Sequence, residues 1–162
     1  MSNWPNLFVV NQFFQQGECD AIVAEMKTAA GSAATVYGTT VSGAVDEAVR
    51  RTLRVKPSNE TVALVIQKLL GFEGAIEKHF DVVLKECEDP QFLRYREGDF
   101  FVAHQDGNTG LLRLETEKRL ISTVIFLSRE SETPEVGAYS GGSLVFSSVR
   151  ERFRLPAEPG ML

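Results

Sequence analysis

The order of structural patterns along the chain predicts an α+β fold in which strands predominate. Helical patterns occupy the first half, at residues 13–30, 58–70 and 72–85, and short apolar runs separated by polar breaks fill residues 90–155. Helices followed by a series of strands are typical of α+β domains. With 162 residues, 43% of them hydrophobic, the chain is long enough for one core and is expected to form a single domain.

Local signals support each predicted helix. From Ile22 onward the apolar residues of the first helix follow helical spacing. Glu18 lies in its first turn, where the helix dipole favours acids, and Gly31 can end it. Ser58 can cap the second helix, and Gly71 separates it from the third.

Short apolar or alternating runs predict the strands. Strands are expected at residues 7–10, 34–37, 50–56, 92–96, 100–106, 121–127, 143–149 and 152–155. Residues 121–127 are almost continuously apolar, which indicates burial on both faces of a sheet. Residues 38–49 and 128–140 are polar loops. The second is either a cover for a substrate site or a simple connector.

Composition excludes several kinds of partner. The net charge of −5 provides no electrostatic attraction for nucleic acid or for an anionic membrane. No apolar run approaches the roughly 18 residues of a membrane span, and the N-terminal residues lack a signal-peptide pattern. Cys19 and Cys87 form no Cys-x-x-Cys pair, so a zinc or redox role is not expected. We expect a cytoplasmic protein.

The most informative stretch runs from Phe92 to Asp106. It predicts a strand, a turn at residues 97–99 and a second strand ending in His104-Gln-Asp106. Residues i and i+2 of a strand project from one face, so the imidazole and the carboxylate should lie together. They would be two ligands of the two-His-one-carboxylate triad that binds Fe(II). On the tripeptide alone, a surface histidine beside a solvated aspartate is the commoner explanation, because His-x-Asp occurs by chance in many proteins.

Further motifs extend this pattern. Their positions are Tyr95-x-x-Gly98, Phe101, His104-x-Asp106, residues 119–127, residues 141–146 and Pro156-x-x-Pro159-Gly160. In order and spacing they resemble the Fe(II)/2-oxoglutarate dioxygenases of the prolyl 4-hydroxylase-like branch. The resemblance covers residues 92–160. It implies a double-stranded β-helix, a jelly-roll or cupin-like barrel, with residues 1–89 as a supporting region of helices and strands and residues 90–162 as the barrel core.

The resemblance also implies an activity and its cofactors. Such enzymes use Fe(II) and 2-oxoglutarate, in some cases with ascorbate as reductant, and hydroxylate a substrate while releasing succinate and CO₂. The substrate would be a prolyl or other peptidyl residue, or a small molecule. The implied metal ligands are His104 and Asp106, Arg119 lies near the substrate, and the cosubstrate pocket is lined by Tyr95, Val124, Phe126 and Leu144.

The chain departs from this family in two ways. Phe101 and Phe126 stand where many members have tyrosine, so a hydroxyl that could bind the cosubstrate is missing. The family's second metal histidine and a basic residue for the far carboxylate of 2-oxoglutarate follow the Pro-Gly turn, whereas this sequence ends at Leu162. The only other histidine, His79, falls on a predicted helix.

These departures leave other possibilities open. A barrel without its last two strands should bind iron poorly and leave residues 125, 127, 144 and 146 uncovered. We expect such a chain either to associate with another copy or to be only part of the molecule. The chain could also be a non-catalytic, cupin-like binding module that has lost the triad. A zinc hydrolase using the same pair is a third possibility, although zinc normally needs three protein ligands.

Overall fold

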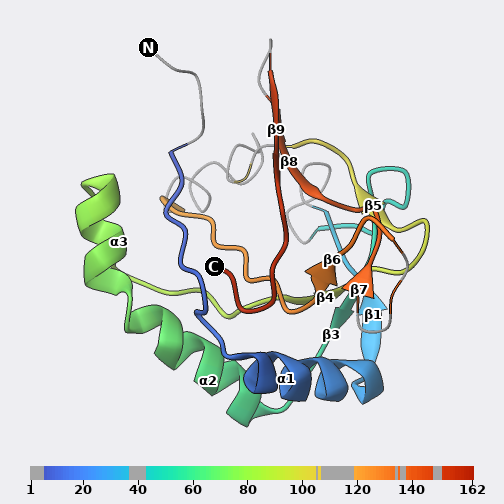
Figure 1. The fold of residues 1–162 in the computed structure, drawn as a ribbon, viewed down its shortest axis with the longest axis horizontal. Coiled ribbons are helices and arrows are strands. Elements are labelled where there is room, and N and C mark those ends of the chain that lie inside the picture. The colour runs from blue at the N-terminus through green and yellow to red at the C-terminus, as the bar shows by residue number, and fades with distance from the viewer. Residues whose placement is uncertain are drawn as a thin grey trace.

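The computed structural model describes residues 6–36, 43–104, 106, 119–133, 135, 138–147 and 151–162. These residues confirm the α+β class, with three helices and several small sheets (Figure 1). Their strands form one three-stranded and three two-stranded sheets, and no closed barrel or jelly roll is present among them. None of the described helices is both long and apolar enough to cross a membrane.

All three predicted helices are present. They are α1 (Gln16–Thr28), α2 (Asn59–Leu70) and α3 (Glu73–Phe80). Ser58 caps α2 as expected, because its hydroxyl accepts a hydrogen bond from the Thr61 amide at 3.2 Å. The third helix is shorter than predicted. It ends at Phe80 because Asp81 adopts a left-handed conformation with φ of 55°.

The strands up to residue 101 differ from prediction in length and pairing. They are β1 (Gly31–Ala33), β2 (Arg50–Arg51), β3 (Leu53–Val55), β4 (Phe92–Arg94) and β5 (Phe100–Phe101). The predicted strand at residues 50–56 is divided at Thr52, and its two parts join different sheets. Strand β3 lies between β1 and β4, whereas β2 pairs with β5.

This division corrects the expected geometry of the central stretch. Strands β4 and β5 do not pair with each other, although Asp99 and Arg96 close the predicted turn through an amide-to-carbonyl bond of 2.9 Å. Instead they pair with β3 and β2. The proposed supporting region and the proposed barrel core therefore share two sheets.

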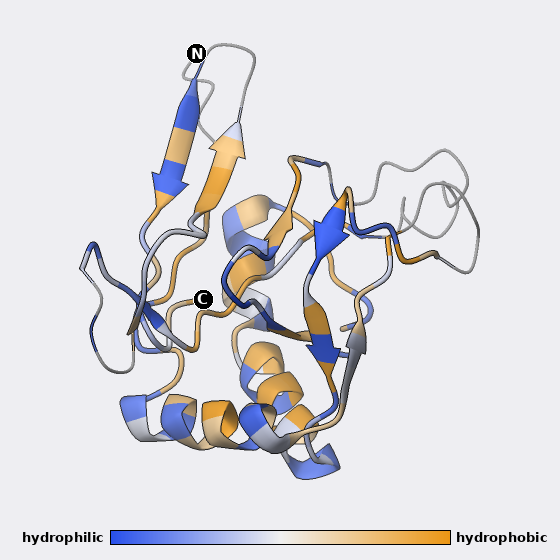
Figure 2. Ribbon diagram, turned by 90° about the vertical axis from the view of Figure 1, so that its right-hand side faces the viewer, coloured by the Kyte–Doolittle hydropathy of each residue, from blue (hydrophilic) through white to orange (hydrophobic). Residues whose placement is uncertain are grey.

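The second half contains β6 (Arg129–Glu130), β7 (Ala138–Tyr139), β8 (Leu144–Ser147) and β9 (Arg152–Leu155). The predicted β8–β9 hairpin is confirmed, with antiparallel pairing from Leu144 opposite Leu155 to Ser147 opposite Arg152. Figure 2 shows this hairpin standing away from the helices, with β8 largely hydrophobic and β9 alternating. Residues 129–130 and 138–139 form a short parallel pair inside the predicted loop.

Two predicted strands are wrong, and a third is not found where the structure describes it. Residues 121–127 form no strand; Phe126 alone exchanges backbone hydrogen bonds with Met161 and Gly160. Residues 7–10 also form no strand, although Val10 exchanges two bonds with Leu162. Of the run at 34–37, residues 34–36 form no strand; β1 lies just before them, and Val36 forms a single antiparallel bridge with Ala44. Parts of the predicted strands and loops lie outside the described residues, namely residues 37–42, 105, 134, 136–137 and 148–150.

The core lies between the helices and the strands that follow them. Its buried members are Phe13, Phe14, Cys19, Ile22, Met26, Val55, Val65, Phe92 and Leu162. Lys68 links α2 to α1 by donating to Glu18 at 2.7 Å and to the Phe13 carbonyl at 3.1 Å, and its hydrogen bond lowers the pKa of the Glu18 carboxyl. Because Leu162 is a member of this cluster together with Cys19, Ile22 and Met26 of α1, the C-terminal residue belongs to the same core as α1.

The side chains expected to be uncovered are partly covered. Ile125 and Leu127 pack against the core, and Leu144 and Phe146 are half-buried. Their neighbours Val124 and Val145 are more exposed, at 48% and 45%. Residues 125 and 127 face the core because alternate residues of an extended segment point the same way.

Candidate metal centre

His104 and Asp106 lie together just after the end of β5. His104 Nε2 is 3.2 Å from Asp106 Oδ1, so the two side chains lie together as the sequence predicts. The prediction that both residues lie on one strand is wrong, because β5 ends at Phe101. Both side chains remain partly open to solvent, with 41% and 57% of their surfaces exposed.

The hydrogen bond of the other imidazole nitrogen determines which nitrogen of the neutral ring carries the hydrogen. His104 Nδ1 lies 2.9 Å from the Val102 carbonyl oxygen, which can only accept a hydrogen bond. Nδ1 therefore carries the hydrogen, and in the neutral ring Nε2 presents a lone pair to the carboxylate. Two electron pairs facing each other at 3.2 Å repel unless a proton or a metal cation lies between them.

The His104 ring is supported by an aromatic neighbour. Phe101 stacks against it with 3.7 Å between ring centroids and 21° between planes. The guanidinium carbon of Arg50 lies 4.6 Å from the centroid of the same Phe101 ring. This contact follows from the pairing of β2 with β5, which places Arg50 opposite Phe101. The first half of the chain thereby helps to orient the candidate metal ligand.

The geometry of the pair fits a divalent metal. Two neighbouring ligands, each about 2.0–2.2 Å from a metal, lie about 3 Å apart, close to the separation of His104 Nε2 and Asp106 Oδ1. A backbone carbonyl bound to the second ring nitrogen is also the usual support for a metal-binding histidine. Imidazole and carboxylate together suit iron or zinc.

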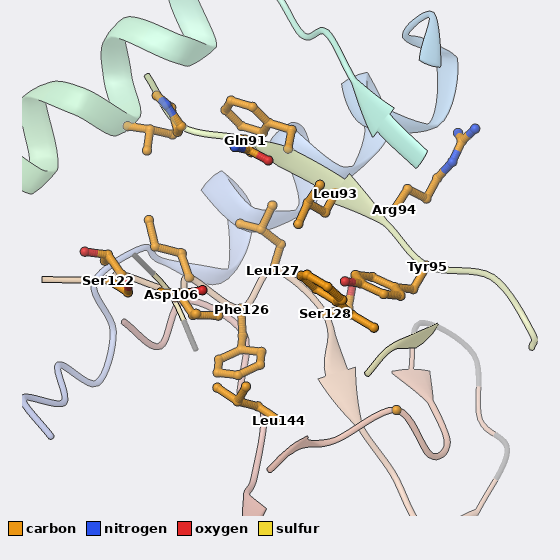
Figure 3. A pocket seen from close by; sticks show the side chains of 18 of the residues that line it. Gln91, Leu93, Arg94, Tyr95, Asp106, Ser122, Phe126, Leu127, Ser128 and Leu144 are labelled. Atoms are coloured by element: carbon orange, nitrogen blue, oxygen red, sulfur yellow. The ribbon is translucent and has the colours of Figure 1, made fainter. Parts of the chain in front are cut away.

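A broad hollow adjoins the pair. It is lined by every predicted site residue, namely Tyr95, His104, Asp106, Arg119, Val124, Phe126 and Leu144. In Figure 3, Leu93 and Arg94 lie on β4 and Gln91 directly precedes it, and Phe126 points away from them toward Leu144. Leu127 points toward Leu93, in keeping with its place against the core. The hollow also includes many other residues, so lining it does not by itself assign a role.

Arg119 has a local partner. Its guanidinium binds the Glu88 carboxylate through two nitrogens, with Nη2 at 2.8 Å from Oε2. Glu88 precedes β4, so this ion pair joins the segment after residue 118 to the β4 side of the hollow. A side chain held in this way can form part of the rim of the hollow. A contact between Arg119 and substrate remains a prediction.

His79 belongs to a different part of the molecule. Its Nε2 lies 3.0 Å from the Asn6 side-chain oxygen, and its ring contacts Phe8 and Phe80. It joins the N-terminal segment to α3 and does not line the hollow. Within the described part of the chain, no three His, Cys, Asp or Glu side chains form a group that could hold a metal.

The sequence interpretation missed Arg50. In the sequence it appears only as part of an alternating strand, and nothing local indicates that it contacts Phe101, the ring that stacks on His104. The missing information is the pairing of β2 with β5, a contact between segments about 50 residues apart. Comparisons with protein-family models, curated proteins and solved structures found no match to this chain.

Proposed function

We propose that this chain binds Fe(II) through His104 and Asp106 and serves as the metal-binding part of a 2-oxoglutarate-dependent hydroxylase. The supporting observation is the pair itself: Nε2 and Oδ1 are 3.2 Å apart while Nδ1 is held by the Val102 carbonyl. Only a proton or a cation relieves the repulsion between these atoms. The proposal includes a double-stranded β-helix to which these small sheets belong. It also includes a cytoplasmic location, which suits the free thiols of Cys19 and Cys87.

The chain's own residues have limited and definite roles in this function. His104 Nε2 and Asp106 Oδ1 would hold the metal, and Phe101 and the Val102 carbonyl would fix the imidazole ring. Bound iron would supply oxidative decarboxylation of 2-oxoglutarate to succinate and CO₂, coupled to hydroxylation of a peptidyl or small-molecule substrate. Val124, Phe126 and Leu144 would provide an apolar part of the wall of the hollow.

A second function is favoured by one observation. The described residues bring only two potential metal ligands together, and Phe101 and Phe126 offer no hydroxyl to a cosubstrate. A cupin-like binding module that holds a metal or an acid without turnover would need no more than this. Both functions predict that the chain binds a metal, and only the hydroxylase predicts turnover of 2-oxoglutarate.

The test separates these steps. Fe(II) is titrated anaerobically into the wild-type protein and the variants His104→Ala, Asp106→Ala and His79→Ala. We expect the first two variants to lose binding and the third to keep it, since His79 contacts Asn6, Phe8 and Phe80. Iron binding that survives Asp106→Ala would refute the metal site.

Turnover is then measured as succinate formed from 2-oxoglutarate in the presence of Fe(II), O₂ and ascorbate. Succinate formation that depends on His104 and Asp106 supports the hydroxylase. Specific iron binding without succinate formation supports the binding module. The variants Cys19→Ala and Cys87→Ala should leave both results unchanged, since Cys19 lies in the buried core and the Cys87 thiol contacts the Glu88 carbonyl.

A further inference from the structure

Arg50 is a buried cation whose charge lies against an aromatic ring. The residue is 9% exposed, and its guanidinium carbon is 4.6 Å from the centroid of the Phe101 ring. Its Nη1 donates to the Thr35 carbonyl at 3.2 Å, and its buried Nε has no acceptor among the described residues. Burying a charge is costly unless other groups compensate for it. In the described part of the chain, the negative face of the Phe101 ring and the Thr35 carbonyl provide that compensation.

The same ring supports the imidazole of the metal pair. Phe101 stacks on His104 with 3.7 Å between ring centroids and 21° between planes. The His104 side chain is 41% exposed, so contact with water leaves its orientation open, and the Phe101 ring and the Val102 carbonyl restrict it. A phenyl ring that a buried cation holds in one plane restricts the imidazole more than a phenyl ring that is free to turn.

The neighbouring residues of β2 and β5 provide an internal comparison. The register places Arg50 opposite Phe101 and Arg51 opposite Phe100, and the Arg51 guanidinium lies 5.4 Å from the Phe100 ring. Because side chains alternate along a strand, the two arginine–phenylalanine pairs face opposite sides. Arg51 is exposed and also donates to the Gly98 carbonyl at 2.7 Å. Both arginines contact a ring of β5, but within the described residues only Arg50 contacts the ring that stacks on the metal ligand.

We propose that Arg50 is a positioning residue for the metal pair. Its buried charge holds the Phe101 ring in place, and that ring holds the His104 imidazole in the orientation in which Nε2 faces Asp106. The effect of Arg50 on Fe(II) affinity rests on the proposed function. Its effect on the imidazole does not, because it is present and measurable without metal.

A purely structural role for Arg50 is the competing explanation. Its bond to Thr35 connects β2 to the segment after β1, and its contact with Phe101 strengthens the β2–β5 pair. Such a role would lower the stability of the fold when Arg50 is replaced, as replacement of Arg51 would. It would not change the surroundings of His104 in a protein that remains folded. The experiments therefore measure the imidazole and its metal affinity, with Arg51 as the matched control.

The first measurement follows the imidazole by NMR in the protein without metal. The chain has two histidines, His79 and His104, and a His79→Ala variant assigns their Cε1–H signals. A stacked aromatic ring displaces the signal of a proton that lies over it. We expect Arg50→Gln to move the His104 signal toward that of a free histidine and to leave the His79 signal in place, while Arg51→Gln moves neither. A His104 signal that is unchanged in folded Arg50→Gln would overturn the proposal.

The second measurement works in the opposite direction and needs no change at Arg50. The Nε–H signal of Arg50 is recorded in the wild-type protein and in His104→Ala, which truncates a side chain that is 41% exposed and should therefore fold. Because the imidazole and the guanidinium contact one ring, loss of the imidazole should shift the Arg50 signal and leave the Arg51 signal unchanged. An Arg50 signal that is the same in both proteins contradicts the proposal, and it does so whether or not Arg50→Gln folds.

The third measurement is Fe(II) affinity, titrated by anaerobic calorimetry. Loss of a residue that orients a metal ligand typically weakens metal binding about 10- to 100-fold. Since Arg50 acts through Phe101, we expect the lower end of this range, about ten-fold, in Arg50→Gln. Arg50→Lys keeps a cation beside the ring and should recover part of the affinity. Arg51→Gln should bind Fe(II) as tightly as the wild type, even if it unfolds at a lower urea concentration.

A double variant tests whether Arg50 acts through the ring. Arg50→Gln combined with Phe101→Leu should bind Fe(II) no more weakly than Phe101→Leu alone, because the ring through which the arginine acts is already gone. Losses of affinity that add up in the double variant would mean that Arg50 acts by another route, and they would overturn the proposal.

The positioning role and the proposed function can fail separately. If Fe(II) does not bind but Arg50→Gln moves the His104 signal, the positioning role stands and the proposed function fails. If Fe(II) binds and a folded Arg50→Gln protein keeps both the His104 signal and the wild-type affinity, the metal site stands and Arg50 is structural.

Discussion

Gly160 lies directly against Phe14, which joins the end of the chain to the start of the fold. A Cβ atom at position 160 would lie 2.0 Å from the Phe14 carbonyl oxygen. The Phe14 amide donates to the Gly160 carbonyl at 3.2 Å, and the Gly160 amide donates to Phe126 at 2.8 Å. Gly160 also has φ of +74°, which side chains rarely adopt.

Replacing Gly160 by alanine should therefore destabilise the protein by about 3 kcal/mol or more, since backbone strain and overpacking act together. Gly141→Ala is the matched control. It has the same φ of +74° but nothing within 4 Å of the added atom, so strain alone should cost about 1 kcal/mol. Urea unfolding measures both. Equal losses for the two variants would contradict the contact with Phe14.

The stability of the α1–α2 contact should depend on pH through Glu25. The pKa of its carboxyl is lowered below the usual 4.5, first by the Thr61 hydroxyl and then by the amide and hydroxyl of Ser58. A lowered pKa in the folded state means that the charged form stabilises the fold above pH 4.5. This contribution is lost as the pH falls through the lowered pKa.

Glu25→Gln should consequently be less stable than the wild type at pH 7, and the difference should shrink as the pH falls below 4.5. Thermal unfolding at several pH values tests this expectation. Glu97→Gln, which changes the charge equally at an exposed turn residue, serves as control and should show no such trend. A difference that is constant with pH would argue against the charged hydrogen bonds.

Phe101 should matter for metal affinity without touching the metal. Phe101→Leu removes the ring that stacks on His104 at 3.7 Å and leaves an apolar side chain in β5. We expect Fe(II) affinity to fall about ten-fold, as for other residues that orient metal ligands. Phe100→Leu, one position earlier in the same strand, should leave the affinity unchanged. Calorimetry under anaerobic conditions measures both variants, and equal affinities would remove the orienting role.

Phe126→Tyr tests whether the absent hydroxyl limits cosubstrate binding. The Phe126 ring points toward Leu144 inside the hollow, so an added hydroxyl would reach into it (Figure 3). One hydrogen bond to a charged carboxylate should tighten 2-oxoglutarate binding about ten-fold. Phe146→Tyr on β8 is the control, because Phe146 stacks with Phe153 across the hairpin. Unchanged affinity in Phe126→Tyr would mean that the ring does not face the cosubstrate.

Local chemistry in the sequence determined several elements of this protein. Ser58 specifies the start of α2 because its hydroxyl satisfies a free amide of the first turn. The apolar residues on both sides of residues 148–151 specify the β8–β9 hairpin, whose strands are close in sequence. The closeness of His104 and Asp106 was also predictable, because two residues separated by one position cannot lie far apart.

Other features depended on contacts between distant segments. The sequence does not reveal that residues 50–56 divide between two sheets, because that division depends on which strands β4 and β5 find as partners. It does not reveal that residues 121–127 remain outside any strand while Phe126 binds the C-terminal residues. Arg50 shows the physical reason most clearly. Its burial and its contact with Phe101 follow from pairing across about 50 residues, and only the tertiary structure decides that pairing.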